Sequence, residues 1–287
     1  MKKDRTVAVL KPWTCPTCNR KLSTHYCPTC GESPPSKRDL TLRGLFRQLF
    51  HALSSIDGRL LRSFRCLVTR PGALTVAYVQ GRRISYLGPF QLLLIANVLF
   101  FAGQSLTNTN IASSTLDSHL HNQDWQGVAQ PLVAQRLETT GTTLDLYAPI
   151  FDRANVLHAK SFIILMVLPF ALLLPILFYR SRQPFVAHAV FSLHFYAFLL
   201  LLFCVWLGVA EINVLLGGTG LNSPRMDNAL SLVNLAVCAT YLYVATGTAY
   251  GASGALRIAK VLALSLAVVG ILLGYRFVLF LFTLHTT

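Results

Sequence analysis

Hydrophobic residues gather in five stretches after residue 85. Each stretch holds about 20 mostly apolar residues, the length that an α-helix needs to cross a bilayer. They run from Tyr86 to Leu106, Ser161 to Tyr179, Ala189 to Ala210, Leu230 to Tyr250 and Ile258 to Leu284. The pattern predicts an all-α integral membrane protein with about five transmembrane helices, whose bundle occupies residues 86–287.

Between Asp39 and Arg70, apolar residues recur at helical spacing with arginines interleaved. The apolar positions are Leu42, Leu45, Phe46, Leu49, Phe50, Leu53, Ile56, Leu60, Leu61, Phe64 and Leu67, and the arginines are Arg43, Arg47, Arg59, Arg62 and Arg65. This pattern is typical of helices that lie in the membrane interface with their arginines toward anionic head groups. A helix packed on the protein's own cytoplasmic face would show the same pattern. We assign residues 39–85 to basic amphipathic interfacial helices, which Arg70-Pro71-Gly72 interrupts.

Composition and charge narrow the class of protein. Hydrophobic residues make up 53% of the chain and charged residues only 13%, about half the charged share of an average soluble domain, which argues against a soluble enzyme. The net charge is +14, and residues 1–85 hold 16 Lys and Arg against 4 Asp and Glu. A basic head could bind nucleic acid. Anionic lipid and the positive-inside bias explain the charge equally well, so we rank nucleic acid below a protein partner.

The Lys and Arg content of the connections predicts the orientation of the helices. Basic residues are frequent in the head, at 180–188 and just before the fifth stretch, whereas acids outnumber them at 107–160 and 211–229. Cytoplasmic connections carry the basic excess. We therefore expect a multi-pass protein of the bacterial inner membrane, with a cytoplasmic N-terminus and an extracytoplasmic loop at 107–160. No secretory signal is expected, because the first 39 residues lack an apolar segment.

Four cysteines form two C-x2-C pairs, Cys15 with Cys18 and Cys27 with Cys30. Two such turns facing each other supply the four thiolates of a closed tetrahedral Zn²⁺ site. Gly31 after the second pair, and Asn19 after the first, suit the left-handed backbone that such turns need. Residues 1–38 are thus predicted to be a cytoplasmic zinc ribbon with one structural Zn²⁺ per chain. A redox C-x2-C, a rubredoxin-type iron centre, a vestigial site and a ligand role for His25 are the alternatives.

Two histidines in or near the third stretch, His188 and His194, are the best candidates for chemistry inside the bundle. They do not share a helix face, since six residues turn a helix by well over half a circle. Neither has a neighbouring carboxylate in the sequence to orient it. We predict no catalytic residue, and we interpret the polar residues of the spans mainly as hydrogen-bonding groups between helices.

Three separated motifs occur in a fixed order. They are Tyr26-Cys27-Pro28-Thr29-Cys30-Gly31; then Arg70-Pro71-Gly72, Tyr78, Gly81-Arg82-Arg83, Tyr86 and Pro89; and then His188-Ala189-Val190-Phe191-Ser192-Leu193-His194. In this order they resemble an uncharacterised bacterial family of zinc-ribbon integral membrane proteins, over residues 15 to about 200. Asn19 departs from the glycine usual in that family. The resemblance implies an architecture and no activity.

Arg70, Arg82, Arg83 and Tyr86 are candidate membrane-interface residues. Arginines just before a span anchor in phosphate head groups, and tyrosines favour the interface depth. Anchoring is the simpler interpretation, and recognition of a specific lipid is the alternative.

Three functions remain open from the sequence. The first is a non-enzymatic membrane protein whose zinc ribbon docks a cytoplasmic protein partner or stabilises an assembly. The second is a small transporter or permease component, suggested by polar residues in several spans. The third is a lipid-modifying membrane enzyme that uses His188 or His194.

Overall fold

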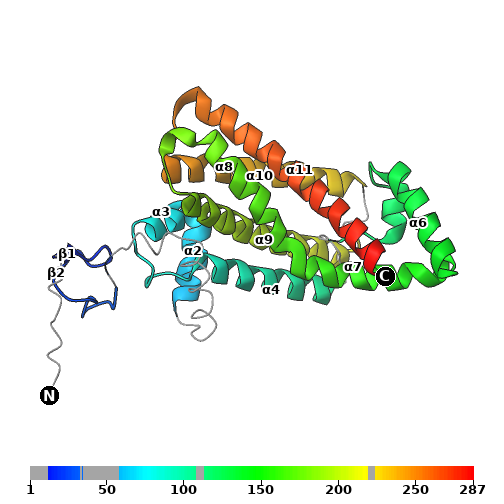
Figure 1. The fold of residues 1–287 in the computed structure, drawn as a ribbon, viewed down its shortest axis with the longest axis horizontal. Coiled ribbons are helices and arrows are strands. Elements are labelled where there is room, and N and C mark those ends of the chain that lie inside the picture. Colours follow the sequence, from blue (N-terminus) through cyan, green and yellow to red (C-terminus); the bar gives the residue numbers. More distant parts are fainter. Residues whose placement is uncertain (1–11, 33, 35–57, 108–112, 219–223) are drawn as a thin grey trace, which may run out of the picture.

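The computed structural model describes residues 12–32, 34, 58–107, 113–218 and 224–287, and the side chains of 224–229 are excluded from that description. Most of the amphipathic segment predicted from Asp39 onward lies outside these residues. The described part is mainly helical, with one two-stranded hairpin near the N-terminus (Figure 1). The hairpin pairs β1 (Trp13–Thr14) antiparallel with β2 (Lys21–Leu22).

The helices run in chain order from the head to the C-terminus. They are α2 (Arg59–Thr69), α3 (Ala73–Val79), α4 (Pro89–Thr107), α5 (Leu116–His121), α6 (Gln126–Thr140), α7 (Leu144–Phe162), the 3-10 turn η2 (Ile163–Met166), α8 (Val167–Leu177), the 3-10 turn η3 (Tyr179–Ser181), α9 (Phe185–Leu215), α10 (Pro224–Tyr250) and α11 (Gly254–Thr286).

Five helical segments in the described chain are long and apolar enough to cross a membrane, which confirms the predicted all-α class. They are Pro89–Thr107, Leu144–Leu177, Phe185–Leu215, Leu230–Tyr250 and Gly254–Thr286. The second differs most from its predicted bounds, because its helix begins at Leu144 and not near Ser161. Gly141, with φ of +65°, ends α6, and Thr143 in an extended conformation starts the next helix. The charged residues Asp145, Asp152, Arg153 and Lys160 therefore lie within the first half of a helix whose later turns are apolar throughout.

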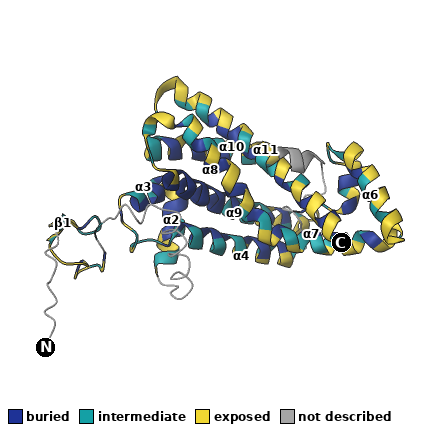
Figure 2. Ribbon diagram, viewed as in Figure 1, coloured by how far each residue is buried: buried dark blue, intermediate teal, exposed yellow. Residues whose placement is uncertain are grey.

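The long helix α9 forms the centre of the bundle. Every residue from Val186 to Leu200 is buried, on all sides of the helix. A helix that is apolar around its whole circumference belongs in the interior. The helices α4 and α8 pack along α9, and α3 and α10 also contact it. The outer faces of α8, α10 and α11 carry many of the exposed apolar residues (Figure 2).

The helix α2 packs its apolar face on the bundle. Cys66 and Leu67 are buried in the main core, and Leu60 and Phe64 pack against it. The opposite face exposes Leu61 and the arginines Arg62 and Arg65. This described part of the amphipathic segment thus contacts the protein itself on one side.

A second, smaller core lies at the far end of the bundle from the hairpin. It joins α5, α6, the start of α7 and the end of α11 through apolar side chains. Figure 1 shows these elements at the end that carries the C-terminus. Its buried members are Leu116, Leu120, Ala129, Val133, Tyr147, Phe151, Phe280 and Leu284. The 107–160 connection, which the sequence indicated only as a polar loop, is therefore largely a packed helical layer in its described residues.

At the head end, Gly72 lets the turn between α2 and α3 approach α10 closely. Its φ is +83°, and a Cβ atom there would lie 2.6 Å from the backbone oxygen of Ala245. Both the backbone angle and the space exclude a larger residue. The Arg70-Pro71-Gly72 sequence is thus a helix-breaking turn whose glycine touches a helix distant in the chain.

We predict that Gly72→Ala destabilises the protein. A left-handed non-glycine residue costs about 1–3 kcal/mol, and the contact with the Ala245 oxygen adds to that cost. The midpoint of thermal unfolding in detergent should fall by several degrees. Gly208→Ala is the matched control, because Gly208 lies in α9 and nothing is within 4 Å of its Cβ position. An equal effect of the two substitutions would contradict the close contact.

Candidate functional site

The four N-terminal cysteines converge on one point. Their sulfur atoms all lie within 4.8 Å of one another. The Sγ–Sγ distances are 3.4 Å between Cys15 and Cys30, 3.4 Å between Cys18 and Cys27, and 4.0 Å between Cys18 and Cys30. A tetrahedral ion with bonds of about 2.3 Å to sulfur requires sulfurs about 3.8 Å apart. The cysteine cluster therefore has the dimensions of a four-thiolate metal site.

Two equivalent turns build the cysteine cluster. In the first, the Asn19 amide donates to the Cys15 carbonyl (2.8 Å); in the second, the Gly31 amide donates to the Cys27 carbonyl (2.7 Å). Asn19 and Gly31 have φ of +57° and +74°. The predicted left-handed positions are thus confirmed at both residues.

Backbone N–H groups of the second turn act on the Cys27 thiol. Burial raises its pKa, but the amides of Cys30 and Thr29 and the neighbouring thiols outweigh burial and lower the pKa to about 6, whereas the coupling among the thiols leaves the pKa values of Cys30 and Cys18 raised. A thiol with such a pKa is largely thiolate at neutral pH, the form that binds a metal.

Next to the cysteine cluster, Glu32 is buried and accepts a hydrogen bond from Thr17 Oγ1 (2.8 Å). Gly31 faces the membrane domain, since a Cβ atom there would lie 3.6 Å from Ile84 Cδ1. The ribbon thus touches the loop that connects α3 and α4.

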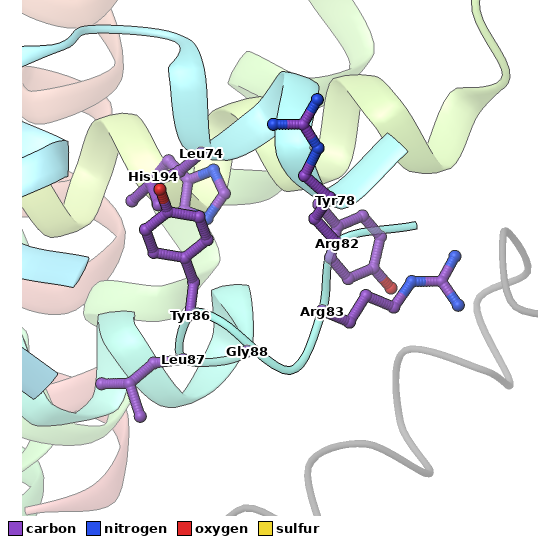
Figure 3. Close-up of a pocket in the computed structure, with 8 residues that line it drawn as sticks. All are labelled: Leu74, Tyr78, Arg82, Arg83, Tyr86, Leu87, Gly88 and His194. Atoms are coloured by element: carbon purple, nitrogen blue, oxygen red, sulfur yellow. The ribbon is translucent and has the colours of Figure 1, made fainter. Parts of the chain in front are cut away.

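That loop borders an open pocket at the head end of the bundle. The pocket is small, with about 30 Å³ of space accessible to the centre of a water molecule. It is lined by Leu74 and Tyr78 of α3, by Arg82, Arg83, Tyr86, Leu87 and Gly88 of the loop, and by His194 of α9. Figure 3 shows the two arginines on one side and Tyr86 with His194 on the other. We call this the arginine pocket.

Hydrogen bonds hold the walls of the arginine pocket together. His194 Nδ1 lies 2.9 Å from Thr75 Oγ1, both of them buried. The Leu87 amide donates to Ser63 Oγ of α2 (2.9 Å). The Arg83 guanidinium lies 4.9 Å from the centre of the Tyr78 ring, a distance at which cation–π attraction is effective.

The predicted site residues divide into separate places. Arg82, Arg83, Tyr86 and His194 meet in the arginine pocket, and Arg70 is exposed at the end of α2. His188 lies elsewhere, with Nδ1 3.0 Å from the Tyr250 hydroxyl. The two histidines therefore do not act on one centre in this arrangement.

His188 belongs to a stack of side chains at the α8–α9 and α10–α11 turns. Tyr250 stacks on His188 (5.4 Å between ring centres) and on Phe178 (4.3 Å). The Lys260 ammonium lies 4.6 Å from the centre of the Phe178 ring. These contacts link the end of α8 with α9, α10 and α11 at the head end.

Sequence reasoning missed Ser63 and Thr75, which fix the pocket walls. Both are fully or nearly fully buried polar residues on otherwise apolar helix faces. A polar residue in such a position is a usable signal, because buried hydroxyls require partners. Their partners, however, are distant in the chain and could not be identified from the sequence.

A far-end polar network was also missed. Asn155 of α7 donates to the Ser114 carbonyl (2.7 Å) and accepts from Thr283 of α11 (3.2 Å), and His158 Nδ1 lies 2.9 Å from Thr283 Oγ1. These bonds tie the helical layer to α11.

Comparison with known proteins gives one partial match. A family model described as "Protein of unknown function (DUF3667)" matches residues 57–101. The matched segment includes α2, α3, the loop of the arginine pocket and the first part of α4. No curated protein and no solved structure matches the chain. The match supports the expected resemblance to an uncharacterised family over this segment only.

We predict about one metal ion per chain in the purified protein, held by the cysteine cluster. Cys27→Ser should lose the ion and leave the head open to trypsin at Arg20 and Lys21, because so small a segment has no other core. Elemental analysis and limited proteolysis measure both effects. Cys204→Ala, in the bundle, is the control and should retain the ion. Full metal content after replacement of all four cluster cysteines would contradict the site.

We also predict that the stability of the far-end layer depends on pH. Burial, with a contribution from Arg276, lowers the pKa of His119 to about 4, and His119 Nδ1 accepts a hydrogen bond from Trp125 Nε1 (3.2 Å). A histidine with a lowered pKa stabilises the fold fully above its unfolded pKa of about 6.5, and that stability is lost as pH falls toward 4. Between pH 7 and pH 5 the loss is about 2 kcal/mol.

The fluorescence of Trp125 measures unfolding of this layer in a chain whose other two tryptophans, Trp13 and Trp206, are replaced by Phe. The unfolding midpoint should fall between pH 7 and pH 5, and His119→Gln should flatten the dependence. An unchanged pH profile in His119→Gln would assign the effect to other groups.

Proposed function

We propose that this is a non-enzymatic, multi-pass membrane protein whose zinc ribbon docks a cytoplasmic protein partner or stabilises an assembly. The closed cysteine cluster carries the proposal. Four thiols surround the metal position, so no coordination site is left for a substrate or an activated water. A closed metal site of this kind stabilises a fold and does not catalyse a reaction.

Zinc is the metal that we propose, with a structural role and one ion per chain. The two shortest sulfur distances join cysteines of different C-x2-C pairs, Cys15 with Cys30 and Cys18 with Cys27. A redox dithiol would instead bring together the two cysteines of one pair. A tetrahedral shell of four sulfurs suits zinc or iron, and zinc is the usual occupant of structural ribbons.

A cytoplasmic head is supported by where the basic residues lie. The connections that are rich in Lys and Arg lie at the head end of the bundle. Their basic residues are Arg82, Arg83, Arg180, Arg182, Arg257 and Lys260. The positive-inside rule assigns this end to the cytoplasm and the far-end layer to the outside of a bacterial inner membrane. Anionic lipids are then the natural partners of the basic head.

The ribbon surface favours a partner with an acidic surface. Arg20, Lys21 and Tyr26 are exposed, with Tyr26 67% exposed, whereas Glu32 is buried. Tyr and Arg are enriched at protein interfaces. Nucleic acid is less favoured, because the remaining basic residues of the described head lie beside the membrane-spanning helices, where lipid is the nearest anion.

The other two functions receive less support from the geometry. The described contacts of His194 are with Thr75 and those of His188 with Tyr250, and neither set includes a carboxylate. A general base or metal ligand usually has such an orienting group. The arginine pocket opens at one end of the bundle and supplies no path for a transporter.

The proposed orientation, with the head end in the cytoplasm, predicts which introduced cysteines can be labelled from outside the cell. A cysteine at Asp124, exposed in the far-end layer, should react with a membrane-impermeant thiol reagent in whole cells. A cysteine at Gln80, exposed at the head end, should react only after the membrane is opened. Both are made in a chain with Cys66, Cys204 and Cys238 replaced by Ala. The reverse pattern would place the ribbon outside and remove the case for cytoplasmic docking.

Docking predicts a discrete crosslinked product from the ribbon. A photoreactive amino acid at Tyr26 should capture one protein in intact cells, in an amount comparable to the chain itself. The double substitution Arg20→Glu and Lys21→Glu should abolish the product while the metal content stays at about one per chain, because neither residue is a ligand. A product that survives both this change and the loss of the metal in Cys27→Ser would contradict docking by the ribbon.

A further inference from the structure

His119 lies in the middle of the far-end core. It is 1% exposed and belongs to the buried face of α5, together with Leu116 and Leu120. The centre of its ring lies 4.7 Å from that of Phe280 in α11 and 6.1 Å from that of Phe151 in α7. A titratable side chain is therefore placed where α5 meets two of the membrane-spanning helices.

The hydrogen bonding of His119 suits its neutral form alone. Trp125 Nε1 lies 3.2 Å from Nδ1, and an indole nitrogen can only donate. Nδ1 must therefore accept, which places the single ring proton on Nε2. Nε2 is buried and has no hydrogen-bond partner among the described residues. A proton added to Nδ1 would face the Trp125 N–H, so protonation breaks this bond and leaves a buried cation without an acceptor.

The charged groups around His119 do not favour its protonation. Arg276 of α11 acts on it with a positive charge, which adds to the effect of burial and lowers the pKa of His119 further. Asp117 and His121 of α5 are exposed and lie 3.0 Å from each other. Asp152 of α7 accepts a hydrogen bond from the first amide of α5 (2.7 Å). These two carboxylates are thus engaged elsewhere.

Few buried side chains attach α5 and α6 to the bundle. We call residues 116–140, which contain both helices, the α5–α6 pair. Its buried residues are Leu116, His119 and Leu120 of α5, and Ala129 and Val133 of α6. The α6 members are apolar, and Arg136, about one turn after Val133, is half-buried and basic. Gln130 Nε2 donates to the Leu120 carbonyl (2.9 Å), which joins the two helices to each other.

The polar bonds between this region and α7 lie at one end of the α5–α6 pair. Asn155 donates to the Ser114 carbonyl (2.7 Å), and Asp152 accepts from the Leu116 amide. Neither bond involves His119. The start of α5 can therefore stay attached to α7 when the core around His119 separates.

We propose that the α5–α6 pair is a pH-sensitive cover, which opens away from α7 and α11 when His119 is protonated, while the membrane-spanning bundle stays folded. Opening gives the imidazolium access to water and uncovers Phe151 and Phe280. Residues 114–116 form the hinge. The cover depends neither on the ribbon nor on its protein partner. In the proposed orientation it lies outside the cytoplasm, where it meets the pH of the surroundings.

Hydrogen–deuterium exchange of the full-length, metal-loaded protein in neutral detergent measures this opening helix by helix. Mass spectrometry follows the exchange, and protection at each pH is corrected for the exchange rate of the unfolded chain. Between pH 7 and pH 5 the protection of α5 and α6 should fall about 20-fold, because the pKa of His119 is about 4 in the closed form and about 6.5 in the open form. The protection of α9 should not change.

Substitution of His119 isolates its contribution from that of Asp152. His119→Gln should remove the fall in protection, because an amide gains no proton in this range. His121→Gln is the matched control, since His121 is exposed two residues later in the same helix, and it should keep the full fall. Should His119→Gln leave α5 and α6 unprotected at pH 7, His119→Leu replaces it, because an apolar side chain needs no partner in this core.

A fall that is confined to α5 and α6, kept in His121→Gln and absent from the His119 variant supports the cover. Unchanged protection of α5 and α6 in the native chain would overturn it. An equal fall in α9 would show general unfolding in place of local opening. A full fall in the His119 variant, or its loss in His121→Gln, would assign the pH dependence to other groups and overturn the role of His119.

Discussion

The burial of the first half of α9, from Val186 to Leu200, on every side is the constraint on which the rest of the bundle depends. An apolar helix in a bilayer gains little from exchanging lipid for protein, so its enclosure relies on close packing and on hydrogen bonds between helices. The helices α4 and α8 supply the packing along its length. At its head end the polar residues His188 and His194 receive partners from α10 and α3. The positions of α3 and of the end of α10 thus follow from the hydrogen-bond partners that the polar residues of α9 need.

The ribbon follows a different physical principle. Within residues 12–32 and 34 it has a pair of two-residue strands and contributes no member to either apolar core. Its order comes from two short turns with left-handed residues and from the sulfur atoms that they bring together. The bundle holds its shape through packing and the ribbon through ligation, so the two parts would respond independently to detergent and to a chelator.

Local features of this protein were predictable from the sequence, and contacts between distant segments were not. The cysteine turns depend on residues within a few positions, so Asn19 and Gly31 could be assigned their backbone conformation in advance. The spans were found because hydropathy over about 20 residues reports on the solvent of a helix. The start of the second span at Leu144 was missed, because Asp145, Asp152, Arg153 and Lys160 interrupt the apolar pattern of its first half, whose Tyr147 and Phe151 belong to the far-end core. The arginine pocket was predicted only in parts, since the His194–Thr75 contact joins residues 119 positions apart.

The length of the second spanning helix gives the two ends of the bundle unlike surroundings. A run of 34 residues from Leu144 to Leu177 extends for about 50 Å along its path, against a hydrocarbon layer of about 30 Å. Roughly 20 Å of this length exceeds the hydrocarbon thickness. At the far end, α5, α6 and the end of α11 pack around the start of the helix. A molecule approaching from that side meets a folded layer well before it reaches the lipid, whereas one approaching from the head side meets arginines almost at the level of the lipid phosphates.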